Sequence, residues 1–265
     1  IHGFQILCEV KDLINIKIDY DELLICVPSA NRTQILKILD MCKRVGKTYK
    51  TVPTLAELID KDIYLDSIRE VSYVDLLGRE EIKLDMRPIK KMLEGKRILI
   101  SGAGGSIGRE LLNQCISFNP AQITCVEIDE EKTFDLGFLN DEHRSIFINP
   151  KLVNINQKNQ LEKVFKDDKP QIIFHAAAYK HVPIQELNPW TAVETNVKGT
   201  LNLVELSDKF NIEKFVLVST DKAVNPVNVM GATKRVAEKI IQSINQKSKT
   251  QFMAVRFGNV LGSSR

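Results

Sequence analysis

Apolar and polar positions alternate in a regular way through the carboxyl-terminal two-thirds of this 265-residue chain. Short apolar runs, typical of buried strands, are separated there by segments whose apolar residues recur every three or four positions, as in an amphipathic helix. The expected strands are Arg97–Ser101, Gln122–Ile128, Lys151–Ile155, Gln171–His175, Lys214–Ser219 and Phe252–Phe257. The expected helices are Ile107–Phe118, Leu161–Asp167, Trp190–Phe210 and Val229–Gln246. This alternation predicts a doubly wound α/β fold, in which helices cover both faces of a parallel sheet.

The first third of the chain has the pattern of a smaller, partial α/β domain. Its expected elements are a strand in Asp21–Pro28, a helix over Asn31–Val45, a strand in Lys47–Pro53 and a short helix over Thr54–Ile59. No glycine-rich turn precedes them, so the sequence gives no reason to expect nucleotide binding there. Periodicity weakens and charge rises from Lys61 to Gly95, and we place the domain boundary near Met86. Residues 1–86 then form the partial domain and its connection, and residues 87–265 form the larger domain.

Composition narrows the class of protein without identifying it. The net charge is only +3, and basic runs such as Lys90-Lys91 carry no interleaved aromatic residues, so a nucleic-acid partner is not expected. The five cysteines are scattered and never spaced as CxxC, which favours buried free thiols in a reducing, cytoplasmic compartment and no metal site. No apolar run reaches the roughly 18 residues needed to cross a bilayer. Because the chain opens without Met and stops at Arg265 inside a motif, we expect it to be a piece of something longer.

The segment Arg97–Gly108 (RILISGAGGSIG) joins an apolar strand to a helix through three spaced glycines. In such a turn Gly102 permits the tight bend, Gly105 lets the backbone approach a pyrophosphate, and Gly108 allows close helix packing. The helix then presents free N–H groups to the phosphates. The residues expected at the pyrophosphate are Gly102, Gly105, Ser106, Ile107 and Gly108. A glycine-rich turn that binds nothing is the alternative.

The second expected strand ends in acidic residues about 20 positions after the glycine turn, as in dinucleotide-binding proteins. Glu127 is our first choice for the adenosine ribose hydroxyls and Asp129 the second. A carboxylate there repels a 2′-phosphate, so NAD is favoured over NADP. A solvated carboxylate at a strand end is the simpler interpretation of Glu127.

Two further strand ends have residues suited to a flat cofactor. Asn154 and Ile155 end the third strand, where a polar side chain can face an adenine ring. The fourth strand runs into Ala176, Ala177 and Ala178, and small residues at that edge let a cofactor pass closely. Tight helix packing would also explain the alanines.

A further motif follows the fifth strand. Thr220-Asp221-Lys222 comes directly after that strand, and Met230 and Lys234 lie four residues apart at the start of the next helix, on one helical face. Short-chain dehydrogenases/reductases place the YxxxK pair at this spacing, and here methionine replaces the tyrosine. Alone, that loss argues against catalysis because methionine has no proton to exchange.

Several motifs together make the resemblance specific. In chain order they are GAGGSIGREL, FHAAAYKHVP, NPWTAVETNVKGT, STDKAVNPVNVMGATKR and RFGNVLGSS. The chain resembles the extended short-chain dehydrogenase/reductases (Rossmann fold) of polysaccharide biosynthesis, and within them the membrane-associated UDP-N-acetylglucosamine 4,6-dehydratases. Methionine commonly stands at the tyrosine position in that group, and Val74–Glu80 (VDLLGRE) is similar to its interdomain connection. Related glucose-nucleotide dehydratases carry Thr-Asp-Glu where this chain has Thr220-Asp221-Lys222.

The resemblance implies an NAD-dependent lyase that converts UDP-N-acetylglucosamine into a UDP-4-keto-6-deoxy-N-acetylhexosamine, with residues 87–265 as its NAD-binding catalytic domain. Asp221 is then the general acid, with a raised pKa, and Lys222 the base at carbon 5, with a lowered one. Thr220 is expected at the carbon 4 oxygen of the sugar. Lys234 is expected at the nicotinamide ribose.

The resemblance implies roles for four more residues. Asn196 resembles the family's structural asparagine, which is expected to hold a main-chain carbonyl or a water near the active site, and it is placed with the cofactor-binding residues. Plain helix-to-backbone bonding would explain it equally well. Lys180, His181 and Asn259 are expected at the nucleotide sugar. The simpler interpretation of His181 is a structural histidine, and that of Asn259 is a turn residue before Gly262.

Two other functions stay open on the sequence. One is an NDP-sugar epimerase on the same fold, which typically keeps the tyrosine. The other is a non-catalytic nucleotide-binding or scaffolding module, for which the missing tyrosine is the best argument. The resemblance further implies a homo-oligomer, with any membrane attachment made through a segment outside this chain.

Overall fold

A computed structural model describes residues 7, 9–15, 19–27, 32–46, 48–51, 69–70, 84–142, 146–258 and 260. The chain divides into two compact units, Ile1–Leu84 and Asp85–Arg265. Each unit is described by itself.

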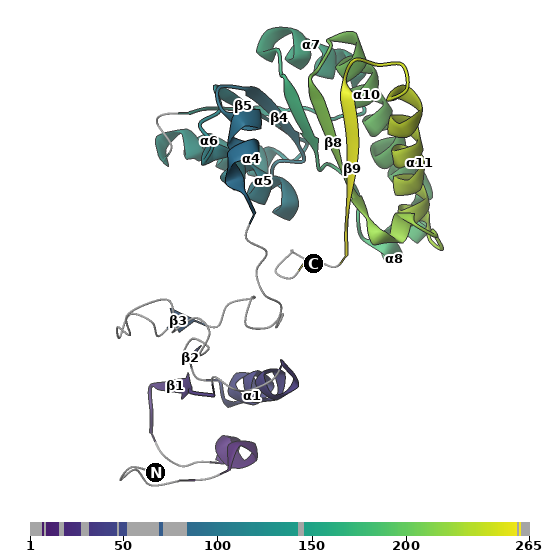
Figure 1. Cartoon of the computed structure of the whole chain (residues 1–265). Helices are drawn as coiled ribbons and strands as arrows, with labels where there is room; N and C mark the ends of the chain where they lie inside the picture. The colour runs from purple at the N-terminus through teal and green to yellow at the C-terminus, as the bar shows by residue number, and fades with distance from the viewer. Residues whose placement is uncertain are drawn as a thin grey trace. The chain divides into compact units, whose positions relative to one another are not determined.

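The described residues of the amino-terminal unit form a small three-stranded sheet and two helical segments (Figure 1). Its elements are η1 (Val10–Asn15), β1 (Glu22–Ile25), α1 (Arg32–Val45), β2 (Thr48–Thr51) and β3 (Arg69–Glu70). β1 and β2 are parallel, and β3 pairs antiparallel with β2. Ile25, Leu39 and Cys42 form its buried core. The helix expected over Thr54–Ile59 lies outside the described residues.

The larger unit contains a six-stranded parallel sheet. Its strands are β4 (Arg97–Ser101), β5 (Gln122–Glu127), β6 (Phe147–Leu152), β7 (Ile172–His175), β8 (Lys214–Thr220) and β9 (Gln251–Phe257). They lie in the order β6-β5-β4-β7-β8-β9, and every neighbouring pair is parallel. This is the predicted doubly wound fold. The order reverses between β4 and β7, the point at which such sheets bind ligands beyond the carboxyl ends of their strands.

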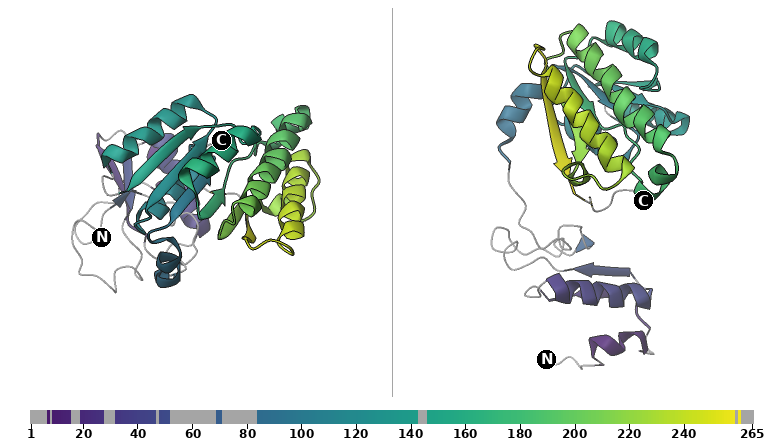
Figure 2. Two further views of the ribbon diagram at one scale, coloured as in Figure 1. Left: turned by 90° about the horizontal axis from the view of Figure 1, so that it is seen from above. Right: turned by 90° about the vertical axis from the view of Figure 1, so that its right-hand side faces the viewer.

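Helices cover both faces of this sheet (Figures 1 and 2). They are α4 (Met86–Leu93), α5 (Ser106–Ile116), α6 (Glu130–Glu142), α7 (Lys158–Asp168), α8 (Val182–Leu187), α9 (Pro189–Ala192), η3 (Val193–Gly199), α10 (Thr200–Lys209), η4 (Asp221–Ala223) and α11 (Val229–Ile244). Residues of α4, α5 and α6 pack with Ile98 and Ile100 in one core. Residues of α7, α10 and α11 pack with Leu99 in the other. Successive residues of β4 therefore point to opposite faces, so both helix layers are held by one strand.

Some predicted boundaries were wrong. β6 begins at Phe147 rather than Lys151 and contains Pro150, which is tolerated because β6 is an edge strand. Helix α6 was not predicted, because its apolar residues lie on opposite sides: Leu136 is buried, whereas Phe134 is exposed. A single helix was expected over Trp190–Phe210, whereas the structure has three successive helical segments there: α9, the π-helical segment η3 and α10.

Cysteine burial partly follows the prediction. Burial raises the pKa of the Cys115 and Cys125 thiols to about 12, so they stay protonated. Cys26 is exposed, which contradicts the expectation of a buried thiol, and Cys8 lies outside the described residues.

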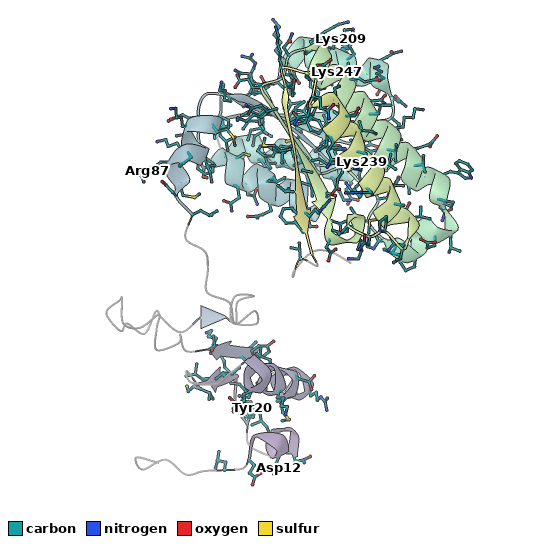
Figure 3. All side chains as sticks on the ribbon, turned by 45° about the vertical axis from the view of Figure 1, so that its right-hand side comes forward. Asp12, Tyr20, Arg87, Lys209, Lys239 and Lys247 are labelled. Atoms are coloured by element: carbon teal, nitrogen blue, oxygen red, sulfur yellow. The ribbon has the colours of Figure 1, made fainter. Side chains whose placement is uncertain are left out.

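The outer faces of the helices are charged. Lys209 on α10 and Lys239 on α11 are exposed and carry their ammonium groups on this outer surface (Figure 3). Within the described residues, no helix has both the length and the apolar character needed to span a membrane.

Candidate functional site

A cleft of about 1430 Å³ opens at the carboxyl ends of the parallel strands. Most residues predicted from sequence line it, and they come from the carboxyl ends of β4, β5, β6, β7 and β8 and from α11. They are Gly102, Gly105, Ser106, Ile107, Gly108, Glu127, Asp129, Asn154, Ile155, Ala176, Ala177, Ala178, Lys180, His181, Thr220, Lys222 and Lys234. Among the described residues, no group of three or more His, Cys, Asp or Glu side chains could hold a metal ion.

The glycine turn is closely packed against the end of β7. Gly102 has a φ of +70°, and a Cβ there would lie 2.6 Å from the Cα of Ala177. A Cβ on Gly108 would overlap the carbonyl oxygen of Gly102. Helix α5 begins at Ser106 directly after this turn, so its first N–H groups face the cleft. The turn and the alanine row together leave room for a phosphate-bearing ligand against bare backbone.

Glu127 contacts the glycine turn directly. One carboxylate oxygen accepts a hydrogen bond of 2.8 Å from the amide of Gly104, and the other accepts one of 2.9 Å from the amide of Ile128. The residue is only 7% exposed, yet it lines the cleft. The second oxygen also accepts a hydrogen bond of 3.3 Å from the amide of Asp129, so the oxygen bonded to Gly104 is the one that keeps a lone pair for a ligand hydroxyl. Glu127 therefore braces the turn as well as facing the cleft.

Asp129 lies at the start of α6 beside a lysine that the sequence analysis did not single out. Its carboxylate accepts a hydrogen bond of 3.2 Å from the amide of Lys132 and lies 3.4 Å from the Nζ of that residue. The Lys132 amide is the main cause that lowers the pKa of Asp129. Both side chains line the cleft, so the acidic edge predicted for the ribose also carries a cation.

Asp221 is held open to solvent at the end of β8. Its side chain is 58% exposed and does not line the cleft. The carboxylate accepts hydrogen bonds from the Thr220 hydroxyl at 3.0 Å and from the Lys222 Nζ at 3.4 Å. These bonds, that of Thr220 first, lower the pKa of Asp221. The predicted raised pKa is therefore wrong for this open arrangement, in which hydrogen bonding stabilises the anion.

Lys234 and Met230 lie side by side on the cleft-facing side of α11. Lys234 is 5% exposed, and its Nζ donates a hydrogen bond of 2.9 Å to the carbonyl oxygen of Val218. Burial lowers its pKa to about 8. A Cβ on Gly231 would lie 2.5 Å from the carbonyl oxygen of Lys222, so the first turn of α11 packs directly on the Thr220-Asp221-Lys222 segment.

Asn196 is not a cofactor contact. It is fully buried and lines no part of the cleft. Its side-chain oxygen accepts a hydrogen bond from the amide of Tyr179, and its Nδ2 donates to the Tyr179 carbonyl and to the Thr233 hydroxyl. The expectation that it holds a main-chain carbonyl near the site is met at Tyr179, whereas its grouping with the cofactor-binding residues is not supported, because every polar atom of its side chain is bonded inside the protein. It positions the loop after β7.

Other residues of the cleft were missed. Tyr179, Thr195 and Ser219 line it beside the predicted motifs. Tyr179 directly follows the alanine row and Ser219 directly precedes Thr220, so their position next to predicted cleft residues could have identified them. Lys180 and His181 are exposed at the cleft, as predicted for ligand contacts, whereas Asn259 lies outside the described residues.

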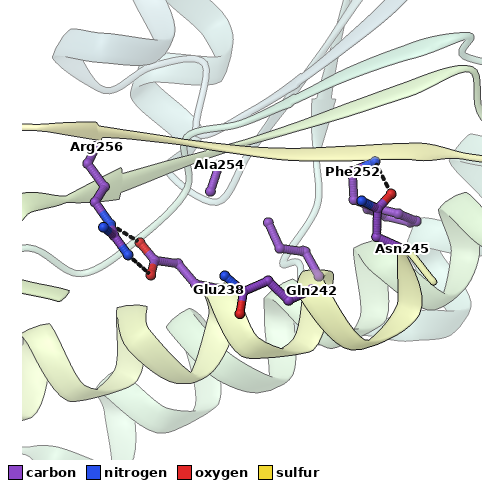
Figure 4. Close-up of a pocket in the computed structure, with 7 residues that line it drawn as sticks. Glu238, Gln242, Asn245, Phe252, Ala254 and Arg256 are labelled. Atoms are coloured by element: carbon purple, nitrogen blue, oxygen red, sulfur yellow. Dashed lines mark hydrogen bonds and ion pairs between the residues drawn. The ribbon is translucent and has the colours of Figure 1, made fainter. Parts of the chain in front are cut away.

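A second, smaller pocket of about 370 Å³ lies between α11 and β9 (Figure 4). At one end Glu238, only 1% exposed, accepts hydrogen bonds of 2.7 and 2.8 Å from the Arg256 guanidinium. Ser219 donates to the same carboxylate at 2.7 Å. These bonds, led by that of Arg256, lower the pKa of Glu238 to about 2. The cluster ties the end of β8 to α11 and β9.

Comparison with known proteins gives the family. Residues 98–265 match the family described as "Polysaccharide biosynthesis protein". The chain belongs to this family. It is 38% identical over 259 residues to the capsular polysaccharide biosynthesis protein CapD of Staphylococcus aureus, a match that covers 96% of this chain and 43% of that protein. It is 34% identical over 177 residues to a UDP-N-acetylglucosamine 4,6-dehydratase (inverting) of Campylobacter jejuni, covering 65% of this chain and 51% of that protein.

A solved structure agrees with these matches. The X-ray structure of Pen from Bacillus thuringiensis superimposes with a TM-score of 0.60 at 33% identity, covering 64% of this chain and 53% of that one. The chain thus spans about half the length of these relatives. The resemblance to polysaccharide-biosynthesis proteins of the extended short-chain dehydrogenase/reductase type is confirmed.

Proposed function

We propose that this chain is the NAD-binding and catalytic portion of a nucleotide-sugar 4,6-dehydratase that acts on UDP-N-acetylglucosamine. One observation carries the proposal: Thr220, Lys222 and Lys234 line the same cleft as the glycine turn. The dehydratase among its relatives supports this reaction for the family.

The residues present fit an NAD molecule. Gly102, Gly105 and Gly108 line the cleft without side chains beside the first turn of α5, which suits a pyrophosphate. Glu127 and Asp129 line the same cleft and offer carboxylates to an adenosine ribose. When bound, NAD would accept the hydride of sugar carbon 4 and return it to carbon 6.

The protein side chains would move the protons. With carbon 4 oxidised, the proton on carbon 5 becomes acidic, and Lys222 removes it as the base. Asp221 protonates the carbon 6 hydroxyl, which leaves as water, and Thr220 holds the carbon 4 oxygen by a hydrogen bond. Met230 takes no part, so Lys222 or a water receives the proton of the carbon 4 hydroxyl. When the hydride has returned to carbon 6, the proton that Lys222 took goes back to carbon 5, and the proton of the carbon 4 hydroxyl replaces, through solvent, the one that Asp221 gave up. The net change is then the loss of one water from the sugar.

Asp221 must gain a proton before it can act as the acid. In the open cleft its carboxylate is exposed and its pKa is lowered. A bound sugar that covers this loop would exclude water, and desolvation raises a carboxyl pKa. We therefore assign the raised pKa to the substrate complex.

Mass spectrometry of the nucleotide sugar tests the proposal. Incubation with UDP-N-acetylglucosamine and NAD is expected to give a product lighter by one water, with no net NADH. Asp221→Asn should abolish this product and leave NAD binding unchanged, whereas Asp208→Asn, an exposed carboxylate on α10, should behave as the unmodified protein. Retained turnover in Asp221→Asn would exclude Asp221 as the acid.

The same assay separates the other functions. An isomer of unchanged mass would indicate an NDP-sugar epimerase. Bound NAD with no product would indicate a nucleotide-binding module.

A further inference from the structure

Five buried polar residues are linked by hydrogen bonds beneath the cleft, one link being made to the main-chain carbonyl of Asn196 and the others between side chains. They are Ser101, His175, Thr200, Asn196 and Thr233, none more than 4% exposed. Four separate elements, β4, β7, the η3–α10 helix and α11, contribute them. Since none of the five lines the cleft, no cofactor or substrate contact explains their polarity.

The hydrogen-bond directions determine the tautomer of His175. The Thr200 hydroxyl donates to the Asn196 carbonyl at 2.7 Å, so it can only accept from His175 Nε2–H, 2.8 Å away. The Nδ1 atom is then left to accept the Ser101 hydroxyl proton at 2.7 Å. Burial, together with the positive charge of Lys234, lowers the pKa of His175 well below its ordinary range. The imidazole is therefore neutral, with its proton on Nε2.

The series of hydrogen bonds continues from Asn196 to helix α11. Asn196 Nδ2 donates to the Thr233 hydroxyl at 3.0 Å, and that hydroxyl donates to the Met230 carbonyl at 2.8 Å. At the other end Ser101 directly precedes Gly102 of the glycine turn. Every donor thus points from the turn towards α11.

We propose that His175 is a positioning residue for the cofactor-dependent reaction: as its Nε2–H tautomer it joins Ser101 to Thr200 and so holds the glycine turn in register with the start of α11. The inference rests on the proposed function for the identity of the cofactor. A buried chain of this kind has one low-energy arrangement, because any break leaves an unpaired donor or acceptor in the interior.

Nitrogen-15 NMR of the imidazole tests the tautomer without any ligand. The His175 signals are expected to show a protonated Nε2 and an unprotonated Nδ1, unchanged between about pH 5 and pH 8. An Nδ1–H tautomer, or titration of His175 within this range, would overturn the proposal.

Matched threonine variants test the positioning role. Thr200→Val keeps the side-chain shape but leaves the His175 Nε2–H unpaired, and is expected to weaken NAD binding by about tenfold, with Thr200→Ser restoring it. Thr124→Val is the control: Thr124 is equally buried and donates to Asp168 at 3.0 Å, but neither Thr124 nor Asp168 belongs to the hydrogen-bonded chain. It should lower the unfolding midpoint similarly and leave NAD affinity unchanged.

The outcomes separate the two proposals. Equal NAD affinities in Thr200→Val and Thr124→Val would overturn the positioning role even though both variants fold. If the unmodified protein binds no NAD, the proposed function is overturned. The imidazole spectrum would then still show whether His175 has the expected tautomer and the hydrogen bonds that depend on it.

Discussion

Lys234 and Val218 are joined by a hydrogen bond of 2.9 Å from a buried ammonium group on α11 to a main-chain carbonyl on β8. The bond sets the lysine in the cleft at the end of the strand that carries Thr220. Burial lowers the pKa of this ammonium to about 8, so its charge is sensitive to pH near neutrality.

NAD affinity should fall as the pH rises through about 8, because Lys234 loses its proton there and with it the charge that favours the cofactor phosphates and ribose. Calorimetric titration with NAD across this range measures the effect. Lys234→Gln should bind weakly at every pH, whereas Lys239→Gln, on the exposed side of the same helix, should keep the profile of the unmodified protein. A flat profile in the unmodified protein would contradict the assignment.

Gly102→Ala should abolish NAD binding and destabilise the protein by about 1–3 kcal/mol. The residue has a φ of +70°, and an added Cβ would meet the Ala177 backbone at 2.6 Å. Gly137→Ala is the matched control, since a Cβ at that helical position meets nothing within 4 Å. It should raise the free energy of unfolding by roughly 0.5–1 kcal/mol, as alanine favours a helix. Chemical denaturation and NAD titration measure both variants.

Glu127→Gln should increase the affinity for NADP relative to NAD by about fivefold, since one negative charge near a 2′-phosphate costs about 1 kcal/mol in water. The amide oxygen of glutamine can still accept the hydrogen bond from the Gly104 amide. Its NH2 group cannot replace the oxygen that accepts from the amides of Ile128 and Asp129, so the variant should also be somewhat less stable. Glu131→Gln, an exposed carboxylate on α6 outside the cleft, serves as the control. An unchanged ratio of the two affinities would assign discrimination to another residue.

Glu238→Gln should lower the free energy of unfolding at neutral pH by roughly 3 kcal/mol, the equivalent of a pKa lowered from 4.5 to about 2. Because the folded pKa is lowered, this stability is present above about pH 4.5 and is lost as the pH falls through about 2. The difference between variant and unmodified protein should therefore vanish at low pH.

The control for this variant is an exposed ion pair. Glu205 pairs with Lys158 at the surface, and Glu205→Gln should change the free energy of unfolding by less than about 1 kcal/mol. Denaturant titrations at several pH values compare both variants. If both variants lost the same free energy of unfolding, the burial of Glu238 would add nothing to the stability of the protein.

The sequence by itself determined the elements whose signals are local. Apolar runs and helical periodicity placed β4, α5 and α11 within a few residues, and the spacing of Gly102, Gly105 and Gly108 predicted the turn between strand and helix. Parallel strands that alternate with helices left few alternatives to a doubly wound sheet. The motifs at the strand ends then had to meet at one edge, so most cleft residues were predictable.

Only the tertiary structure decided how side chains distant in sequence meet. Ser101 and His175 are 74 residues apart and form a hydrogen bond because β4 and β7 are neighbours, a pairing that no local pattern records. The same holds for the pKa values: burial lowers the pKa of Lys234, and a hydrogen bond from Thr220 lowers that of the exposed Asp221. Hydrogen bonds and desolvation depend on the three-dimensional surroundings of an atom, and sequence spacing within one element does not determine them.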